Sequence, residues 1–409
     1  MTIKAGINLE RLQRWERHVK ETYVDAGILP NAQTLVYRQG ELVHQSVIGW
    51  ADVERQIPVR EDSIFRIYSM TKPITSVAFM MLVEEGRVSL SDPVSRFIPG
   101  WAGLEVFEGG ELGSYRTAPV NRPMQMVDLL RHTAGLSYLI QQGGKLDDAY
   151  RKLGLGLKTD LDEFIAGIAG LPLEFSPGEA WHYSAATDVL GYLVGKIAGV
   201  PFEQFVKSRI LEPLGMVDTD FFVPAEKVER FMPCYALTEQ GRVIFNAVEG
   251  SHYLGAPRFV SGGGGLVGTA ADYLRFCRLL LRGGELDGVR LISPKTLELM
   301  TMNHLPGGAD IASLSRSAIA RSESGSAGVG FGLGFAVTLD PTLTLVPGNV
   351  GDFYWGGAAG TYFWIDPLED LAVVFMTQTL YCPDRVRQTL RTMVYAALED
   401  SLTWPESRA

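Results

Sequence analysis

The sequence contains little cysteine. Only Cys234, Cys277 and Cys382 are present among 409 residues, and they lie far apart. Neither a disulfide framework nor a zinc site is built from so few, widely spaced thiols. Basic residues are also in the minority, with 37 Lys and Arg against 47 Asp and Glu, which gives a net charge of -10. A nucleic-acid partner is therefore disfavoured, because a phosphate-binding surface needs an excess of cations.

Long hydrophobic runs are missing as well. No uninterrupted stretch reaches the roughly 18 apolar residues of a membrane-spanning helix, so no membrane span is predicted. The first 27 residues contain no apolar block of the kind that a signal peptide requires, and we expect a cytoplasmic protein. No serine lies in a G-x-S-x-G pattern, which disfavours the nucleophile elbow of an α/β-hydrolase.

Apolar periodicity divides the chain into helical and extended segments. A helix is predicted between Asn8 and Gly27, followed by a β-hairpin of Thr34–Arg38 and Leu42–Gly49. Further helical patterns cover Met124–Leu136, Asp188–Val200 and the segment after Val386, and extended patterns cover Gly330–Leu339, Gly360–Pro367 and Leu371–Gln378. The segment Gly307–Gly328 is rich in Gly, Ser and Ala and is predicted to be a mobile loop.

This order of elements predicts an α+β fold, in which an antiparallel sheet is flanked by helices and carries a helical insertion. Residues 1–90 and 205–409 would form the α/β domain, and residues 91–204 the helical domain.

Ser69 and Lys72 stand three residues apart in "SMTK", at the start of an apolar helix. At this spacing they share one face of the helix. A helix N-terminus favours developing negative charge, and a desolvated lysine can give up its proton near neutral pH. The pair can therefore act as a nucleophile with its own proton acceptor. S-x-x-K alone is a weak signal, because it occurs by chance in many chains.

Two later segments strengthen this interpretation. Tyr183 follows a Pro-Gly turn and precedes an apolar helix. A phenol close to an ammonium can serve as a base, although a tyrosine at a helix start is by itself more often a packing residue. Gly356 and Gly357 precede an apolar strand and would let another backbone approach closely, or would simply form a bulge.

In this order, "SMTK", "YSA" and "WGG" resemble the three motifs of the serine β-lactamase and penicillin-binding protein superfamily. Four flanking segments resemble its class C branch and the family VIII carboxylesterases: "SLSDPVSRFIPG", "LLRHTAGL", "LEPLGMVDTDF" and "SGGGGLVGTAADYLRF". The resemblance spans nearly the whole chain. It implies a β-lactamase-like fold with the active site at the junction of the two domains, and a small-molecule ester as substrate.

The resemblance also implies roles for individual residues. Ser69 would be the acylated nucleophile, and Lys72 and Tyr183 would share proton transfer. The backbone N–H groups of Ser69 and Ala358 would form the oxyanion hole. No metal and no organic cofactor is implied.

Two positions depart from the lactamase pattern. Ala185 replaces the asparagine of the second motif, and Trp355, followed by Gly356 and Gly357, replaces the cation of the third. The family VIII esterases resemble this version more closely, so we expect a serine carboxylesterase that prefers short, uncharged esters. The alternatives are an acyltransferase, a small-amide hydrolase or a D-amino-acid peptidase on the same scaffold, a weak β-lactamase, or a catalytically silent binding protein.

Several other residues are candidates for the site. Substrate contacts are predicted for Trp355, Gly356, Gly357, Tyr138 and His182. Three more aromatic residues are candidate pocket walls, although aromatic residues more often belong to the core: Tyr68, Tyr354 and Trp364. Asp128 and His132 stand at i and i+4 and could mimic a dyad or a metal pair, but no third ligand lies near them in the sequence. The run Gly262–Gly265 lacks the Gly-Lys-Ser/Thr that phosphate binding requires.

Overall fold

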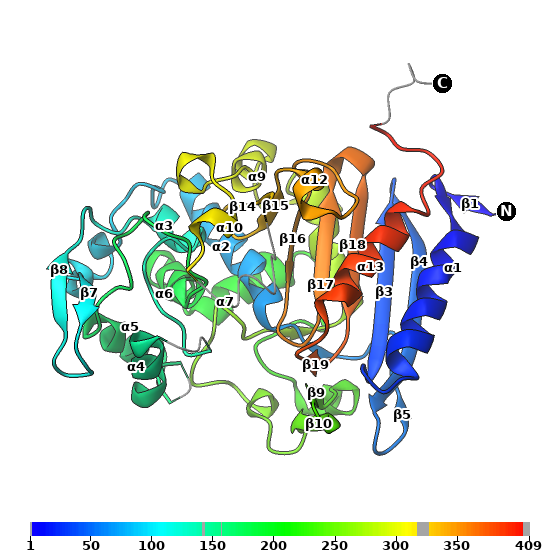
Figure 1. The fold of residues 1–409 in the computed structure, drawn as a ribbon, viewed down its shortest axis with the longest axis horizontal. Helices are drawn as coiled ribbons and strands as arrows, with labels where there is room; N and C mark the ends of the chain where they lie inside the picture. Colours follow the sequence, from blue (N-terminus) through cyan, green and yellow to red (C-terminus); the bar gives the residue numbers. More distant parts are fainter. Residues whose placement is uncertain (1, 141–143, 157, 317–326, 404–409) are drawn as a thin grey trace.

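An eight-stranded antiparallel sheet forms the centre of the molecule (Figure 1). The computed structural model describes residues 2–140, 144–156, 158–316 and 327–403. The strand order is β14-β15-β16-β17-β18-β3-β4-β5. The bounds are Val329–Phe331, Ala336–Thr338, Phe353–Gly356, Tyr362–Asp366, Leu371–Met376, Asn31–Arg38, Glu41–Asp52 and Ile57–Pro58. The sheet thus joins the two ends of the chain, because β18 pairs with β3.

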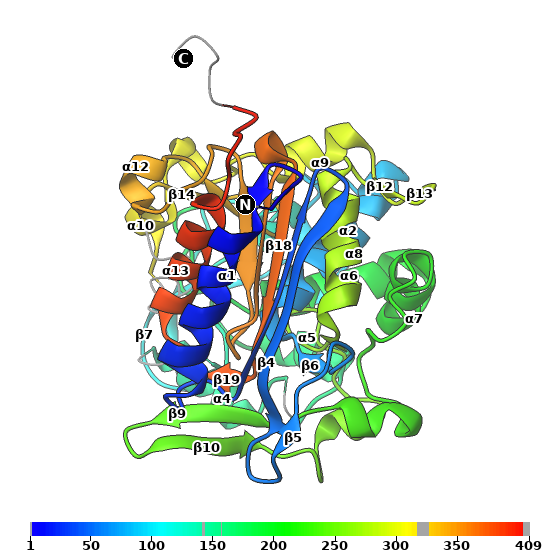
Figure 2. The same cartoon turned by 90° about the vertical axis from the view of Figure 1, so that its right-hand side faces the viewer.

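Helices from the two ends of the chain cover one face of this sheet. α1 (Leu9–Val19), which continues as a π-helical turn over Lys20–Val24, lies beside α13 (Asp384–Tyr395), as Figure 2 shows. The Asn8 side chain caps α1 by accepting a hydrogen bond from the Arg11 N–H, as expected for an N-cap asparagine. α8 (Ala270–Leu281) packs against β17, β18 and β3 on the opposite face.

The middle of the chain supplies a second group of elements. α2 (Thr71–Glu84) packs against α6 (Ala186–Ala198), which connects this group to the sheet region. The other elements between residues 91 and 206 are α3 (Met126–Leu130), α4 (Lys145–Leu153), α5 (Leu161–Ala169), α7 (Phe202–Val206) and the hairpin of β7 (Glu105–Gly109) and β8 (Arg116–Pro119). The α+β class is confirmed; the boundaries at residues 90 and 204 stay predictions.

Shorter elements complete the fold. β6 (Phe65–Arg66) pairs with β11 (Val267–Gly268), and β9 pairs with both β10 and β19. The remaining bounds are β1 Ile3–Lys4, β2 Ile7–Asn8, β9 Cys234–Thr238, β10 Gly241–Asn246, β12 Glu285–Leu286, β13 Val289–Arg290, β19 Thr379–Leu380, α9 Pro294–Met300, α10 Ile311–Leu314 and α12 Pro341–Thr344. Within the described residues, no helix is both long enough and apolar enough to cross a bilayer.

Two sequence predictions of elements were too long. The helix expected over Met124–Leu136 ends at Leu130, because His132 and Gly135 adopt left-handed backbone angles, with φ of 57° and 79°. The strand expected over Gly330–Leu339 is a hairpin of β14 and β15, whose turn contains Gly334 at φ +101°. Residues 317–326 of the expected mobile loop lie outside the described residues; the part before them includes α10.

Candidate active site

Ser69 lies in a 3-10 turn, Tyr68–Met70, that leads directly into α2. Tyr68 has a φ of +43°, a left-handed conformation that is costly for a residue with a Cβ atom. The turn presents Ser69 at the entrance of a helix that is buried along most of its length, and only 6% of the serine is exposed. The serine hydroxyl is thus held in place by a strained turn and a rigid helix.

Three side chains that are separated in the sequence meet at the Ser69 hydroxyl. The Tyr183 hydroxyl lies 2.7 Å from Ser69 Oγ, and Lys72 Nζ lies 3.2 Å from the same atom. Lys72 Nζ also donates to the backbone oxygen of Gly263 at 2.7 Å. Lys72 and Tyr183 are both almost fully buried. The structure therefore places two proton-carrying groups on one candidate nucleophile, away from bulk water.

Aromatic rings surround the Lys72 ammonium and Tyr183. The ammonium lies 4.6 Å from the centre of the Tyr183 ring and 5.4 Å from that of Tyr138. Tyr183 stacks on Trp181 and also contacts Trp355, with ring centres 5.5 Å apart in the second pair. These faces attract a cation electrostatically, so the site tolerates a buried ammonium.

The His132 ring packs against the Tyr183 ring. The two ring centres are 4.9 Å apart, and His132 Nδ1 accepts a hydrogen bond from the Ser184 N–H at 3.3 Å. Burial, reinforced by the nearby Lys72 ammonium, keeps the pKa of His132 well below its usual value, so this ring is neutral at physiological pH. Asp128 does not face it as a metal partner, since its carboxylate is bound by Arg122 and Arg131.

The segment after β16 forms a tight turn beside the nucleophile. The Gly357 N–H donates to the Thr361 oxygen at 2.8 Å, and the Gly360 N–H donates back to the Gly357 oxygen at 3.0 Å. Ala358 is exposed, and its N–H has no acceptor among the described residues. A Cβ atom on Gly357 would lie 2.4 Å from the backbone oxygen of Ile67, so this glycine lets the turn approach the segment that carries Ser69.

Other predicted residues lie in different surroundings. Trp355 is 1% exposed and packs against Phe331 as well as Tyr183. The His182 ring contacts Phe175, and both its nitrogens are buried without a hydrogen-bond partner in the described part of the chain. The Tyr68 hydroxyl points to Cys234 Sγ, at 3.9 Å.

Two of the predicted pocket walls belong to the core instead. Tyr354 and Trp364 pack around the buried guanidinium of Arg391, whose carbon lies 5.6 Å and 5.7 Å from their ring centres. Ala185 is buried, and its N–H donates to the Ser137 oxygen at 3.1 Å. Among the predicted site residues, Lys72 and Tyr183 contact the Ser69 hydroxyl, and the Tyr138 ring lies beside the Lys72 ammonium.

Sequence reasoning missed two residues that support the site. Asp188, on α6, accepts hydrogen bonds from the Gly263 N–H and the Ser261 hydroxyl. Arg387, on α13, donates to the backbone oxygens of Gly357 and Thr361 and so fastens the turn after β16. Asp188 could have been found from the sequence, because it is an acidic residue in the first turn of the apolar helix that follows Tyr183. No local pattern marks Arg387.

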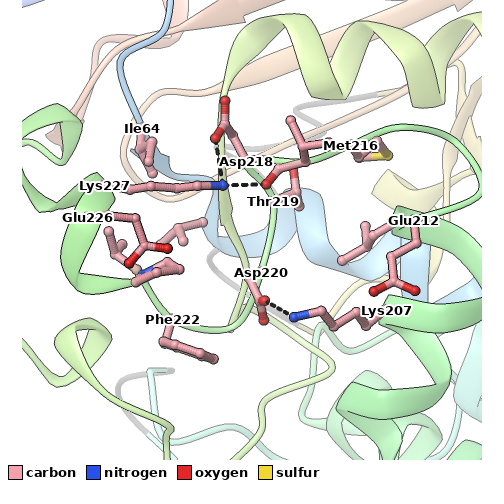
Figure 3. A pocket seen from close by; sticks show the side chains of 15 residues that line it. Ile64, Lys207, Glu212, Met216, Asp218, Thr219, Asp220, Phe222, Glu226 and Lys227 are labelled. Atoms are coloured by element: carbon pink, nitrogen blue, oxygen red, sulfur yellow. Dashed lines mark hydrogen bonds and ion pairs between the residues drawn. The ribbon is translucent and has the colours of Figure 1, made fainter.

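A separate cleft of about 340 Å³ lies between β11 and the segments around residues 207–227 (Figure 3). Its two lysines are paired: Lys227 with Asp218 at 2.8 Å and Lys207 with Asp220 at 3.1 Å. Because these carboxylates already pair with the two lysines, the described lining of this cleft offers an anionic ligand no free lysine, and it lacks the Ser69 constellation.

Comparisons with known proteins identify related sequences and a related fold. Residues 15–397 match the model of the family described as Beta-lactamase. Protein Rv1367c of Mycobacterium tuberculosis (strain ATCC 25618 / H37Rv) is 39% identical over 363 residues, which cover 88% of each chain. Esterase EstB of Burkholderia gladioli is 32% identical over 394 residues, which cover 90% of this chain and 91% of EstB.

A solved structure described as EstCE1, a hydrolase with promiscuous acyltransferase activity, superposes with a TM-score of 0.79 at 28% identity. The match covers 94% of this chain and 99% of EstCE1. The β-lactamase-like fold predicted from the sequence is thereby confirmed. The chain belongs to the Beta-lactamase family, within the serine β-lactamase and penicillin-binding protein superfamily, and is similar to its family VIII esterases.

Proposed function

We propose that this protein is a serine carboxylesterase that hydrolyses short-chain carboxylic esters through an acyl-enzyme on Ser69. One observation carries the proposal: Tyr183 and Lys72 both lie within hydrogen-bond distance of Ser69 Oγ, at 2.7 Å and 3.2 Å. This is the arrangement in which a hydroxyl can lose its proton as it attacks a carbonyl. The similarity to EstB and EstCE1, both described as ester-cleaving or hydrolytic proteins, supports the same reaction class.

The first half of the reaction makes the acyl-enzyme. Ser69 Oγ forms a bond to the ester carbonyl carbon while the carbonyl electron pair moves onto its oxygen, and Tyr183, which enters this step as a phenolate held by the Lys72 ammonium, accepts the serine proton. The tetrahedral intermediate collapses by breaking the bond to the alcohol oxygen, which departs with a proton from Tyr183. Lys72 remains beside both oxygens and stabilises the negative charge that passes between them.

The second half of the reaction releases the acid. A water oxygen attacks the acyl carbon, Tyr183 accepts a proton from that water, and the bond between the carbon and Ser69 Oγ breaks. The proton then returns to Ser69. In both halves the carbonyl oxygen would be held by the N–H groups of Ser69 and Ala358; within the described part of the chain the Ala358 N–H has no acceptor and the residue is exposed, which supports this assignment.

The preference for short, neutral acyl groups rests on the walls of the site. Tyr138 and Trp355 contribute apolar aromatic surface around Tyr183, and Trp355 occupies the place where lactamase motifs carry a cation. Acetate to hexanoate esters should therefore be better substrates than long-chain esters. A kcat/KM that rises continuously to palmitate would contradict this assignment.

Covalent labelling tests the function most directly. A fluorophosphonate should add one label per chain, peptide mapping should place that label on Ser69, and Ser69→Ala should abolish both labelling and ester hydrolysis. Thr75→Val, one turn further along α2, is a matched control that keeps the nucleophile. Labelling at another serine, or full activity in Ser69→Ala, would remove the basis of the proposal.

Acyl transfer to an alcohol is a second candidate, favoured by the promiscuous acyltransferase activity of EstCE1. The same acyl-enzyme serves both reactions, because an alcohol can replace water as the attacking oxygen. Product analysis with an added primary alcohol separates the two. Hydrolysis predicts mainly free acid, and transfer predicts the new ester as the main product.

A further inference from the structure

Asp188 is a buried carboxylate next to the proposed catalytic lysine, with only 2% of the residue exposed. It lies in the first turn of α6. Its Oδ1 atom accepts hydrogen bonds from the Gly263 N–H at 2.9 Å and from the Ser261 hydroxyl at 2.5 Å. A buried carboxylate is expensive unless hydrogen bonds and a counter-charge compensate it. Here the two hydrogen bonds and the Lys72 ammonium supply that compensation.

One residue, Gly263, lies between this carboxylate and the lysine. Gly263 donates its N–H to Asp188 and accepts from Lys72 Nζ on its oxygen, at 2.7 Å. A Cβ atom on Gly263 would lie 2.8 Å from Asp188 Oδ2, so glycine lets the backbone pass between the two charged groups. The hydrogen bond from the Gly263 N–H to Asp188 thus fixes the position of the residue whose carbonyl oxygen accepts from Lys72.

The ionisable groups that face Lys72 come from several segments of the described chain. They are Tyr183 and Tyr138, whose rings flank the ammonium, His132 behind Tyr183, and Asp188 on α6. His132 is neutral, and Tyr183 alternates between phenolate and phenol as it carries the proton. The ionised Asp188 carboxylate is therefore the group of this set whose negative charge does not change when Tyr183 takes up the proton.

We propose that Asp188 is a positioning residue of the reaction, which holds the Gly263 oxygen on Lys72 and supplies the counter-charge that keeps Lys72 as an ammonium throughout the cycle. This inference rests on the proposed esterase function and assigns the two proton-transfer roles. Tyr183 carries the proton between Ser69 and the leaving alcohol, while Lys72 keeps its own protons and acts as a fixed positive charge.

The environment of Asp188 supports the pairing. Burial raises the pKa of the Asp188 carboxyl, and the Lys72 ammonium, the Ser261 hydroxyl and the Gly263 N–H act in the opposite direction. Removal of any one of these three compensating groups should let the carboxyl take up a proton at higher pH. The activity of the enzyme would then fall at a higher pH on the acidic side.

Asp188→Asn is the main test, because it removes the charge and keeps an oxygen that can accept from Gly263. Without the counter-charge Lys72 gives up its proton more readily. We expect kcat to fall about tenfold to a hundredfold on a short p-nitrophenyl ester, and the alkaline limb of the kcat profile to move down by about one pH unit. Thr75→Val is the matched control: it removes the 2.8 Å hydrogen bond to the neighbouring Gly262 oxygen, carries no charge, and should leave the profile in place.

Ser261→Ala provides an independent test if Asp188→Asn does not fold. It keeps the carboxylate but removes one of its hydrogen bonds, so the acidic limb should move to higher pH while the alkaline limb stays. Unmoved limbs in the folded variants would overturn the proposal. If the fluorophosphonate still labels Ser69 in the wild-type protein, that failure concerns Asp188 alone; absence of Ser69 labelling would instead overturn the esterase function.

Discussion

Two adjacent glycines in the turn after β16 should differ sharply in their tolerance of a methyl group. A Cβ atom on Gly357 would lie 2.4 Å from the Ile67 backbone oxygen and 2.2 Å from Thr361 Oγ1. Real Cβ contacts are essentially never shorter than 3.0 Å, so the turn must retreat by roughly 0.6 Å from the segment that precedes Ser69. A Cβ atom on Gly356 would instead meet the guanidinium of Arg387 at 2.8 Å, and that group is the mobile end of a long side chain.

The displacement in Gly357→Ala moves the Ala358 N–H away from the position of the developing oxyanion. Loss of one oxyanion-hole donor costs about a hundredfold to a thousandfold in kcat, and a misplacement approaching 1 Å can cost about a hundredfold. We therefore expect kcat for p-nitrophenyl butyrate to fall at least about a hundredfold in Gly357→Ala. The loss in Gly356→Ala should be smaller, because displacement of the Arg387 guanidinium weakens its hydrogen bonds to Gly357 and Thr361 but does not force the backbone of the turn away from Ile67.

Steady-state kinetics of the two variants, together with thermal melts that confirm folding, checks this prediction. Fluorophosphonate labelling at Ser69 should also slow in parallel with ester hydrolysis, because both reactions place negative charge on an oxygen that lies in the same oxyanion hole. Equal losses in the two variants, or a Gly357→Ala enzyme within threefold of the wild type, would show that the turn does not contribute the oxyanion hole.

Three further predictions concern the proton-transfer pair, the turnover of a β-lactam and the titration of Glu174. Lys72→Ala and Tyr183→Phe should each reduce kcat by about as much as the double variant, on the order of 10²–10⁴, whereas losses that multiply would show separate roles. Nitrocefin should be turned over at least about a hundredfold less efficiently than the best ester in kcat/KM, because Trp355 offers its carboxylate no ammonium; equal turnover would indicate a lactamase. Burial and the nearby Asp147 raise the pKa of Glu174 to about 7, above the 4.5 of the unfolded chain. The contribution of the protonated Glu174 carboxyl to the free energy of unfolding is therefore fully present below pH 4.5 and is lost as the pH rises through 7. Glu174→Gln should therefore be about 1–3 kcal/mol more stable than the wild type at pH 8 in urea denaturation and nearly equal to it at pH 5; equal stability at both would place Glu174 in a more solvated environment.

The sequence predicted most of what local periodicity encodes. The hairpin of β3 and β4, the strands β17 and β18 and the helices α1, α6 and α13 lie where alternation and helical spacing indicated. The errors occurred where a single backbone conformation overrode the pattern. His132 turns into the left-handed region, and the apolar run of Met124–Leu136 therefore ends as a helix at Leu130. Gly334 similarly divides one extended run into two strands.

The candidate site was predictable only in part, for a related reason. The spacing of Ser69 and Lys72 fixes their relative position on one turn of helix, and this local geometry follows from the sequence. Tyr183 reaches the same hydroxyl from 114 residues away, a contact that the family resemblance implied and that periodicity alone does not encode. Arg387, which fastens the turn after β16 from the last helix, has no motif of its own and became visible only once the helix was placed against the sheet.

The glycine run beginning at Gly262 illustrates what a motif search overlooks. The run does not match a phosphate-binding loop, yet each of its first two glycines lies where a neighbouring group leaves no room for a Cβ atom. A Cβ atom on Gly262 would lie 2.6 Å from the Thr187 backbone oxygen, and one on Gly263 would lie 2.8 Å from the Asp188 carboxylate. The segment thus fits between α2 and α6 only because these glycines have no side chains, and this closeness lets one residue, Gly263, contact both Lys72 and Asp188. Glycine is needed at these positions because a larger residue would push the Lys72 ammonium away from the Asp188 carboxylate that we propose to balance it.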